Sequence, residues 1–256
     1  MNSRIAIVTG ASAGIGQATA NRLAYDFTGL VLVARRPNEL AETAARIEAL
    51  GVQTLLASAD LRLPASADQV VKATLDKFGQ IDALVNVAGA VPQIDLFEMT
   101  DEQWEDGTAM KLHGARRLTI KAWPFLKETK GSVVFMSGNS AEAPKPAFAA
   151  VAAINAAIVA LAKAFAEQGI KDGIQVNTIL PGPVMTSRRM NFLQKWAEAN
   201  QVSLEEAEKK FIETAHIERY GEPKEIAELI AFLLSPAAKW LTGTAIRVDG
   251  GEVKAI

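Results

Sequence analysis

The 256-residue sequence predicts an α/β domain built on a seven-stranded parallel sheet with helices on both faces. Three observations predict it. Short, continuous apolar runs alternate with helix-length periodic segments, a glycine-rich turn follows the first run, and no Pro/Gly/Ser linker or charge block divides the chain. Strands that are apolar along their whole length are typical of a parallel sheet buried between two helical layers. We therefore predict one domain over residues 1–256.

The predicted strands are short runs rich in Val, Ile and Leu. In chain order they are 5–8, 30–33, 54–57, 83–87, 133–136, 174–179 and 245–248. Helices are expected from the glycine turn to about residue 25, over 148–166 and over 223–234. Residues 185–218 break this rhythm as a long, charged, helix-prone excursion after Pro181-Gly182-Pro183. Insertions that follow strands often cover binding sites, so this segment is predicted to be a lid, with a solvated helical hairpin as the alternative.

Composition excludes several classes of function. Lys+Arg 27 against Asp+Glu 29 lacks the basic surface expected of a nucleic-acid binder. With no cysteine and only two histidines, His113 and His216, neither thiol chemistry nor a His-rich metal site is expected. The N-terminus enters a strand without a signal-peptide pattern, which predicts a cytoplasmic protein. Residues 146–162 are uncharged but alanine-rich and contain Asn155, which favours a core helix over a membrane span.

The turn after the first strand carries the strongest binding signal. Gly10, Gly14 and Gly16, with Ile15 between the last two, directly follow a strand and open a helix. At such a turn the free N–H groups of the helix N-terminus face a pyrophosphate, and glycine lets the backbone approach it. We therefore predict a dinucleotide site, with a tight turn that holds no ligand as the alternative.

The end of the second strand indicates which dinucleotide is bound. An NAD site places a carboxylate there for the ribose 2′-hydroxyl, whereas a 2′-phosphate favours a guanidinium. The strand here ends in Ala34-Arg35-Arg36. Arg35, assisted by Ser12 and Arg36, predicts NADP(H) in preference to NAD(H); the alternative is that both arginines only solvate the end of the strand.

Several further motifs fall in order along the chain: Asp60-Leu61, Asn86-Val87-Ala88-Gly89, Pro181-Gly182 and an ending with Thr242-Gly243 and Val248-Asp249-Gly250-Gly251. With the glycine turn, they make the chain resemble the short-chain dehydrogenase/reductase family over essentially its whole length. The resemblance implies a doubly wound (Rossmann) sheet, a nicotinamide cofactor at its carboxyl edge, and a homotetramer or homodimer. It places further cofactor contacts at Asp60, Leu61, Asn86, Ala88, Gly89, Met136, Asn155, Pro181, Gly182, Val184 and Thr186.

The sequence departs from the family at the positions that carry its chemistry. Members usually have a tyrosine that protonates the substrate oxygen, a lysine four residues later, a serine that orients the substrate, and an asparagine on the preceding helix. Ungapped alignment from Gly173 to Pro181-Gly182 puts the tyrosine position on Val151 and the lysine position on Asn155. Counting from neighbouring motifs puts the serine position on Gly138 and the asparagine position on Lys111. All four usual residues are replaced.

Two replacements are reciprocal, since lysine stands in the asparagine position and asparagine in the lysine position. Lys111 is therefore predicted to reach the reacting end of the cofactor, where Asn155 hydrogen-bonds the ribose; the alternative is a surface lysine at 111. The valine at 151 can neither donate a proton nor hydrogen-bond an oxyanion. Other candidate donors are Ser137, Asn139, Ser140, His113 and Tyr220, each of which also has an ordinary packing or loop explanation.

Two functions remain open. One is an NADP(H)-dependent oxidoreductase of carbonyl/alcohol type with a degenerate or rebuilt proton relay, acting on an unknown small molecule. The other is a catalytically inactive NADP(H)-binding module that acts as a sensor or partner subunit. Cofactor-free chemistry, as in dehalogenase relatives, would need the missing tyrosine. The helix predicted over 148–166 is apolar nearly all round, so its second side is expected to pack on a partner copy.

Overall fold

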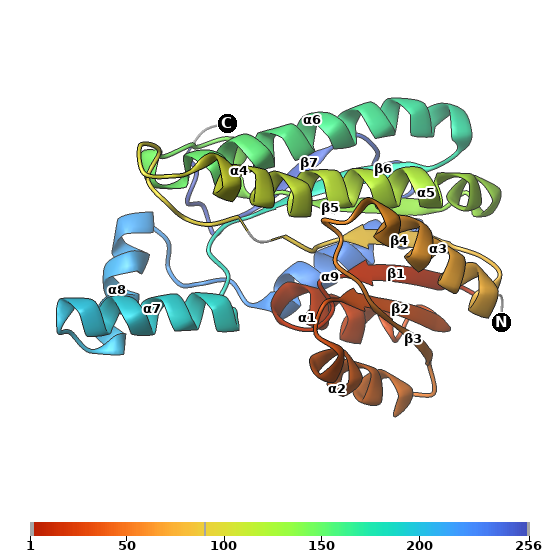
Figure 1. Cartoon of the computed structure of the whole chain (residues 1–256), viewed down its shortest axis with the longest axis horizontal. Coiled ribbons are helices and arrows are strands. Elements are labelled where there is room, and N and C mark those ends of the chain that lie inside the picture. Colours follow the sequence, from red (N-terminus) through yellow and green to blue (C-terminus); the bar gives the residue numbers. More distant parts are fainter. Residues whose placement is uncertain (1–2, 90, 255–256) are drawn as a thin grey trace.

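The computed structural model describes residues 3–89 and 91–254, and it contains one seven-stranded sheet in the order β3-β2-β1-β4-β5-β6-β7 (Figure 1). The strands are β1 (Ile5–Thr9), β2 (Gly29–Ala34), β3 (Gln53–Ser58), β4 (Ala83–Asn86), β5 (Ser132–Met136), β6 (Gln175–Pro181) and β7 (Ala245–Val248). Each neighbouring pair is parallel. The predicted fold class, a doubly wound parallel sheet, is therefore confirmed.

Successive side chains of a strand point to opposite faces of the sheet. Both faces of this sheet are apolar, and helices cover both. In β1, Ala6 and Val8 join one apolar core, whereas Ile5 and Ile7 join the other. The first core lies beneath α1 (Gly14–Leu23), α2 (Pro37–Glu48) and α9 (Pro223–Leu233). The second lies beneath α3 (Pro64–Phe78), α5 (Gly114–Thr129) and α6 (Ala149–Asp172).

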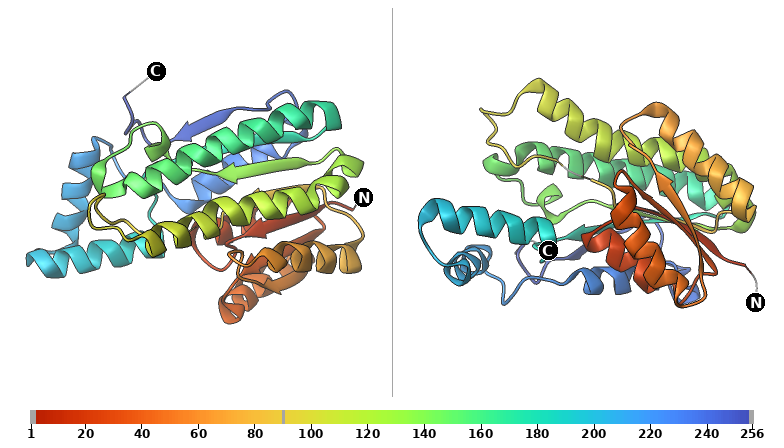
Figure 2. Two further views of the ribbon diagram at one scale, coloured as in Figure 1. Left: turned by 45° about the horizontal axis from the view of Figure 1, so that its top comes forward. Right: turned by 60° about the horizontal axis from the view of Figure 1, so that its bottom comes forward.

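The excursion predicted over 185–218 forms a helical hairpin that projects from the main body in every view (Figures 1 and 2). It consists of α7 (Ser187–Asn200) and α8 (Leu204–Ala215). Phe211 of α8 packs edge-on against Phe192 and Trp196 of α7, with ring centroids 5.3 Å apart in both pairs. These aromatic side chains therefore stabilise the hairpin. Their presence in this segment is explained by packing between α7 and α8 and needs no bound ligand.

The two ends of this hairpin are tied to each other. Val184 pairs with Gly221 in an isolated parallel bridge, and the Met185 N–H donates to the Gly221 carbonyl over 2.8 Å. The segment thus leaves and re-enters the main body at adjacent points. The predicted strand over 174–179 also runs further, as β6 to Pro181, which carries the chain to the base of the hairpin.

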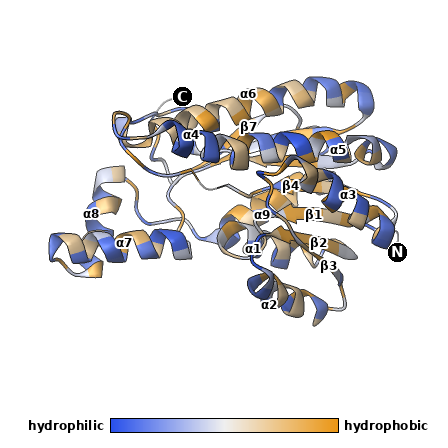
Figure 3. Ribbon diagram, in the orientation of Figure 1, coloured by the Kyte–Doolittle hydropathy of each residue, from blue (hydrophilic) through white to orange (hydrophobic). Residues whose placement is uncertain are grey.

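The long helix α6 is more apolar than the helices around it (Figure 3). With the turn before it, Pro146–Asp172, it is long and apolar enough to cross a membrane by length and composition. That test is also met by core helices, and α6 buries one side against β5 and β6. Its opposite side exposes Ala153, Ala156 and Ala160.

Candidate active site

The order of the strands reverses between β1 and β4, which lie side by side although β2 and β3 separate them in sequence. In open α/β sheets a crevice forms at the carboxyl ends of the strands at such a switch point. The glycine turn follows β1, and the segment Asn86 to Gly89 ends and follows β4. Two motifs singled out in the sequence therefore lie next to each other where such a crevice is expected.

The glycine turn is packed so closely that side chains would not fit. A Cβ on Gly16 would lie 2.2 Å from the Gly10 carbonyl oxygen. Gly10 and Gly14 have φ of +70° and +56°, which L-residues rarely adopt. A Cβ on Gly14 would also lie 3.3 Å from Cγ2 of Thr186 at the base of the α7–α8 hairpin. The glycine turn and the base of the hairpin are thus in contact.

The start of α1 is suited to an anion. Its N-cap residue, Ala13, offers no side-chain hydrogen bond to the first turn. Most helices satisfy their first N–H groups with a side-chain oxygen or a ligand. An uncapped N-terminus beside glycines with no Cβ fits the pyrophosphate of a dinucleotide. The residues present therefore fit the expected cofactor.

Of the predicted 2′-phosphate residues, Arg35 and Arg36 follow β2, and Ser12 lies in the glycine turn after β1. Arg36 Nη2 donates to Ser12 Oγ over 3.3 Å, so these two side chains do come together. Arg36 also pairs with Glu39, with 3.0 Å between Nη1 and Oε1. Arg35 is exposed. The charge of Arg36 is thus partly engaged by a surface carboxylate, which leaves Arg35 as the more available guanidinium.

Asp60 follows β3, where the resemblance places a contact to adenine. Its Oδ2 lies 3.0 Å from Arg62 Nη1, and its Oδ1 accepts from the Arg62 N–H over 3.1 Å. Leu61 is buried, with its Cβ against Gly114 of α5. The Asp60 carboxylate is therefore oriented by its own loop.

The loop after β4 is held by Thr9 at the end of β1. Thr9 Oγ1 accepts from the backbone N–H groups of Val87 and Ala88, both over 2.9 Å. Asn86 is buried and its Nδ2 donates to Thr119 Oγ1 over 3.1 Å, while its Oδ1 has no hydrogen-bond partner among the described residues. The structure thus fixes the Asn86–Gly89 backbone at the crevice and leaves one buried acceptor unsatisfied.

The remaining predicted cofactor residues lie at the carboxyl ends of β5 and β6. Met136 ends β5 and is buried. The Gly182 N–H donates to the Val248 carbonyl of β7 over 3.0 Å. Val184 is buried beside Gly221, and Thr186 caps α7 by accepting from the Arg189 N–H over 3.3 Å.

A π-turn, Ala109–His113, interrupts the path from α4 (Asp101–Thr108) to α5 and carries Lys111. Such one-turn bulges are often found at functional sites because they reorient the side chains within a helix. The aliphatic part of the Lys111 side chain packs directly against Gly89, where an added Cβ would lie 2.9 Å from Lys111 Cδ. Lys111 therefore extends into the crevice at the loop after β4, and glycine at 89 lets it pass.

Lys111 and Asn155, the two residues predicted to have exchanged positions, are in direct contact. Lys111 Nζ donates to Asn155 Oδ1 and, over 3.1 Å, to the Ser137 carbonyl oxygen. The other end of the Asn155 amide, Nδ2, donates to Ser140 Oγ over 2.8 Å. We refer to Lys111, Ser137, Ser140 and Asn155 as the Lys111 cluster. Asn155 is buried, and these bonds fix its orientation.

Gly138, predicted to stand in the family's serine position, leaves the space that the Asn155 amide occupies. A Cβ on Gly138 would lie 2.6 Å from Asn155 Nδ2, closer than real Cβ contacts allow. Because the Asn155 amide is held by Lys111 and Ser140, it cannot move aside without breaking the cluster. Asparagine at 155 can therefore keep this position only while residue 138 is a glycine.

The environment of Lys111 favours loss of its proton. Burial of the ammonium group, together with repulsion from Arg188, lowers the pKa of Lys111 from 10.5 to about 8. An amine with a pKa near neutral pH can both hold and give up a proton under ordinary conditions. Of the predicted candidates, Lys111 best meets the chemical requirement of an acid.

The other candidate donors are engaged elsewhere or lie apart. The Ser137 hydroxyl donates to the Asn155 carbonyl oxygen over 2.8 Å, and Asn139 Nδ2 donates to Glu252 Oε2 over 2.6 Å. His113 shares the π-turn with Lys111, but its Nδ1 has no hydrogen-bond partner among the described residues. Burial, with Arg117 and Arg116 nearby, lowers the pKa of His113. The Lys111 cluster is therefore built without this imidazole.

Two further positions complete this part of the site. Burial raises the pKa of Tyr220, although the Arg189 guanidinium, 5.7 Å from its ring centroid, opposes that rise. A phenol with a raised pKa is a weaker acid. Val151 lies one helical turn before Asn155 on α6 and is partly buried. It presents only an isopropyl group.

One polar side chain in the crevice was not expected from the sequence. Arg188, at the start of α7, donates from Nη2 to the Gly89 carbonyl oxygen over 3.2 Å. It thus spans from α7 to the loop after β4. The only signal in the sequence is a pair of arginines shortly after Thr186, and their directions cannot be read from a helical pattern.

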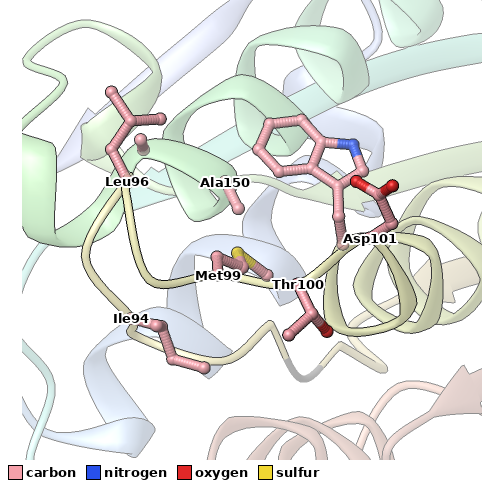
Figure 4. A pocket seen from close by; sticks show the side chains of 8 residues that line it. Ile94, Leu96, Met99, Thr100, Asp101 and Ala150 are labelled. Atoms are coloured by element: carbon pink, nitrogen blue, oxygen red, sulfur yellow. The ribbon is translucent and has the colours of Figure 1, made fainter.

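A separate cavity of about 210 Å³ lies between the loop before α4 and the start of α6 (Figure 4). Trp104 and Ala150 form part of its wall. No predicted cofactor or proton-donor residue lines it. Within residues 3–89 and 91–254, no group of three or more His, Asp or Glu side chains is placed to hold a metal ion.

Comparison with known proteins identifies relatives that match nearly the whole chain. A family model described as enoyl-(acyl carrier protein) reductase matches residues 10–252. A putative ketoacyl reductase of Streptomyces coelicolor is 30% identical over 98% of this chain and 97% of its own length. The 3-oxoacyl-(acyl-carrier-protein) reductase of a Synechocystis species is 33% identical over 99% of this chain and 98% of its own length.

Solved structures give the same result. L-Sorbose reductase from Gluconobacter frateurii, complexed with NADPH and L-sorbose, superposes with a TM-score of 0.95 at 30% identity, covering 100% of this chain and 98% of that one. A variant of actinorhodin polyketide ketoreductase with NADPH superposes with a TM-score of 0.91 at 30% identity, covering 98% of this chain and 97% of that one. The likeness thus extends over whole chains.

Proposed function

Because the chain belongs to the short-chain dehydrogenase/reductase family, we propose that it is an NADP(H)-dependent oxidoreductase of carbonyl/alcohol type whose proton relay is rebuilt around Lys111. The single observation that carries this proposal is the Lys111 cluster. Its ammonium group reaches the crevice from the π-turn and is bonded to the residue that replaces the family's lysine. The site thereby keeps a positive charge. Lys111 supplies it from the turn before α5, whereas the family's lysine would stand on α6.

The cofactor residues support NADP(H). The uncapped start of α1, with Gly14, Ile15 and Gly16, would hold the pyrophosphate, and Arg35 with Ser12 and Arg36 would hold the 2′-phosphate. The two solved relatives above are NADPH complexes. When bound, the nicotinamide supplies or accepts hydride. The loop after β4, Met136 and the β6 end from Pro181 to Thr186 would enclose the rest of the cofactor.

The hydrogen-bond inventory of Lys111 supports a role as acid. An ammonium group has three hydrogens. Two are directed to Asn155 Oδ1 and the Ser137 carbonyl oxygen, which leaves one for a substrate oxygen. A carbonyl that receives hydride becomes an alkoxide and needs a proton or a strong hydrogen bond at its oxygen. We assign that donation to Lys111 Nζ, with Asn155, Ser137 and Ser140 positioning it.

The alternative is a catalytically inactive NADP(H)-binding module that acts as a sensor or partner subunit. Val151 favours it, since an isopropyl group stands where the family usually has its tyrosine and cannot donate a proton. Under this alternative Lys111 would only neutralise or orient the bound cofactor. Binding without turnover distinguishes it from the oxidoreductase.

The test is NADPH consumption over a broad panel of ketones and aldehydes. The native chain is compared with a fourfold variant that restores the usual residues: Lys111→Asn, Gly138→Ser, Val151→Tyr and Asn155→Lys. Positions 138 and 155 must change together because a Cβ at 138 would meet the Asn155 amide at 2.6 Å. We expect native turnover within about tenfold of the variant on at least one compound, as a working relay predicts. Turnover by the fourfold variant alone would favour the inactive module.

The proposal also assigns roles to the α7–α8 hairpin and to the exposed side of α6. The α7–α8 hairpin, whose two ends are joined by the bridge between Val184 and Gly221, would serve as a lid over the crevice. The exposed alanine side of α6 would pack on a second copy, giving a homodimer or homotetramer, because small residues allow close approach of helices. We propose a cytoplasmic protein that acts on a small molecule and binds neither membrane nor nucleic acid.

A further inference from the structure

Arg188 and Lys111 converge on the same residue from opposite walls of the crevice. Arg188 Nη2 donates to the Gly89 carbonyl oxygen over 3.2 Å from the lid. Lys111 crosses the α-carbon of the same glycine, where an added Cβ would lie 2.9 Å from its Cδ. Two positively charged groups therefore lie at one point of the crevice, at the reacting end marked by the Lys111 cluster.

Neither charge is balanced. Repulsion from Arg188 contributes to the lowered pKa of Lys111, and desolvation lowers the pKa of Arg188. No carboxylate raises either pKa, and in the described part of the chain neither side chain forms an ion pair. Arg188 is nevertheless exposed. A side chain that is desolvated by its neighbours yet reached by solvent is expected to line a groove.

An unbalanced pair of cations in a groove is unfavourable until an anion joins them. Arg188 retains donors for that anion, because its guanidinium has five N–H groups and one is directed to Gly89. Carboxylates and phosphates both match the planar guanidinium. The cofactor's own pyrophosphate is already accounted for by the start of α1, which favours the substrate as the source of the anion.

We propose that Arg188 binds a carboxylate on the substrate, so that the protein takes oxo acids rather than neutral carbonyl compounds. This inference rests on the proposed function. Arg188 orients the carboxylate from the lid, and Lys111 faces the carbonyl oxygen next to it. Arg188 is thus a specificity-determining residue, and the substrate both balances its charge and joins the lid to the loop after β4.

The test separates binding from turnover. Pyruvate, acetoacetate and 4-oxopentanoate, and their methyl esters, are titrated by calorimetry onto the native protein loaded with NADP⁺, where no reduction occurs. The same titrations are made with Arg188→Met and with Lys195→Met, which removes one exposed charge from the same helix. Affinity for NADPH is measured by fluorescence for all three proteins.

We expect at least one oxo acid to bind the native protein about 10- to 100-fold more tightly than its ester, as a charged hydrogen-bonded pair predicts. Arg188→Met should abolish this preference and leave the affinity for NADPH unchanged, and Lys195→Met should retain both. A preference that survives Arg188→Met, or no binding of any oxo acid, would overturn the proposal. Weaker NADPH binding by Arg188→Met would instead assign the anion to a cofactor phosphate. Absence of turnover alone would contradict the proposed function and not this inference.

Discussion

Replacing Lys111 with methionine is expected to lower kcat for carbonyl reduction by about 100- to 10,000-fold, the range that a positioned acid contributes. Methionine is similarly long and unbranched, so it fills the space across Gly89 without the ammonium group. Initial rates of NADPH oxidation at saturating carbonyl substrate measure the effect. Affinity for NADPH, followed by fluorescence, should stay near native because the phosphate contacts lie at the start of α1.

The matched control is Lys121→Met on α5, which removes an exposed lysine paired with Asp68. Exposed ion pairs contribute little to stability, so this variant should keep the native kcat. If Lys111→Met kept it as well, Lys111 would be a passive residue and the rebuilt relay would be wrong. If Lys111→Met instead lost NADPH binding with kcat unchanged, the cation would serve the cofactor only.

Gly16→Ala is expected to abolish detectable NADPH binding. The added Cβ would lie 2.2 Å from the Gly10 carbonyl oxygen and 3.0 Å from the Thr9 carbonyl oxygen. Both are backbone atoms that cannot rotate away, so α1 must shift from β1 and its first N–H groups leave the position of the pyrophosphate. Overpacking of this kind also costs about 1–3 kcal/mol of unfolding free energy. Fluorescence titration and urea denaturation measure the two effects.

Gly221→Ala provides the control for the added methyl group. There the nearest heavy atom to a new Cβ would be 3.6 Å away, an ordinary contact, so unfolding free energy should change by less than about 1 kcal/mol. Native affinity for NADPH in Gly16→Ala would mean that the glycine turn shapes the fold and binds no dinucleotide.

Periodicity predicted the sheet well because its central strands, such as β1 and β5, are buried along their whole length. The last strand, predicted over 245–248, coincides with β7 (Ala245–Val248). The ends of elements were less accurate: α6 continues to Asp172, beyond the predicted 166, because a polar exposed last turn contributes no apolar signal. Its end is set instead by Gly173 in the left-handed conformation.

The site shows a similar limit. Counting along the chain predicted that Lys111 and Asn155 occupy exchanged positions, and the structure places them in contact. Counting could not predict that the Ser137 hydroxyl is directed to the Asn155 carbonyl, nor that Gly138 makes room for the Asn155 amide. These relations depend on how α6 lies over β5. Arg188 was missed for the same reason, since its contact with Gly89 joins residues far apart in sequence.

The pH dependence of kcat/KM for NADPH-dependent reduction of a carbonyl substrate tests the role of Lys111 most directly, because kcat/KM reports the pKa of the enzyme before that substrate binds. The pKa of Lys111 is lowered to about 8, so its ammonium form, which donates the proton in reduction, predominates below pH 8 and is lost above it. The native kcat/KM should therefore be constant below about pH 7 and fall toward tenfold per pH unit above about pH 8, and the residual kcat/KM of Lys111→Met should lack this fall. A native kcat/KM that stays level to about pH 10, or the same fall in Lys111→Met, would contradict the assignment.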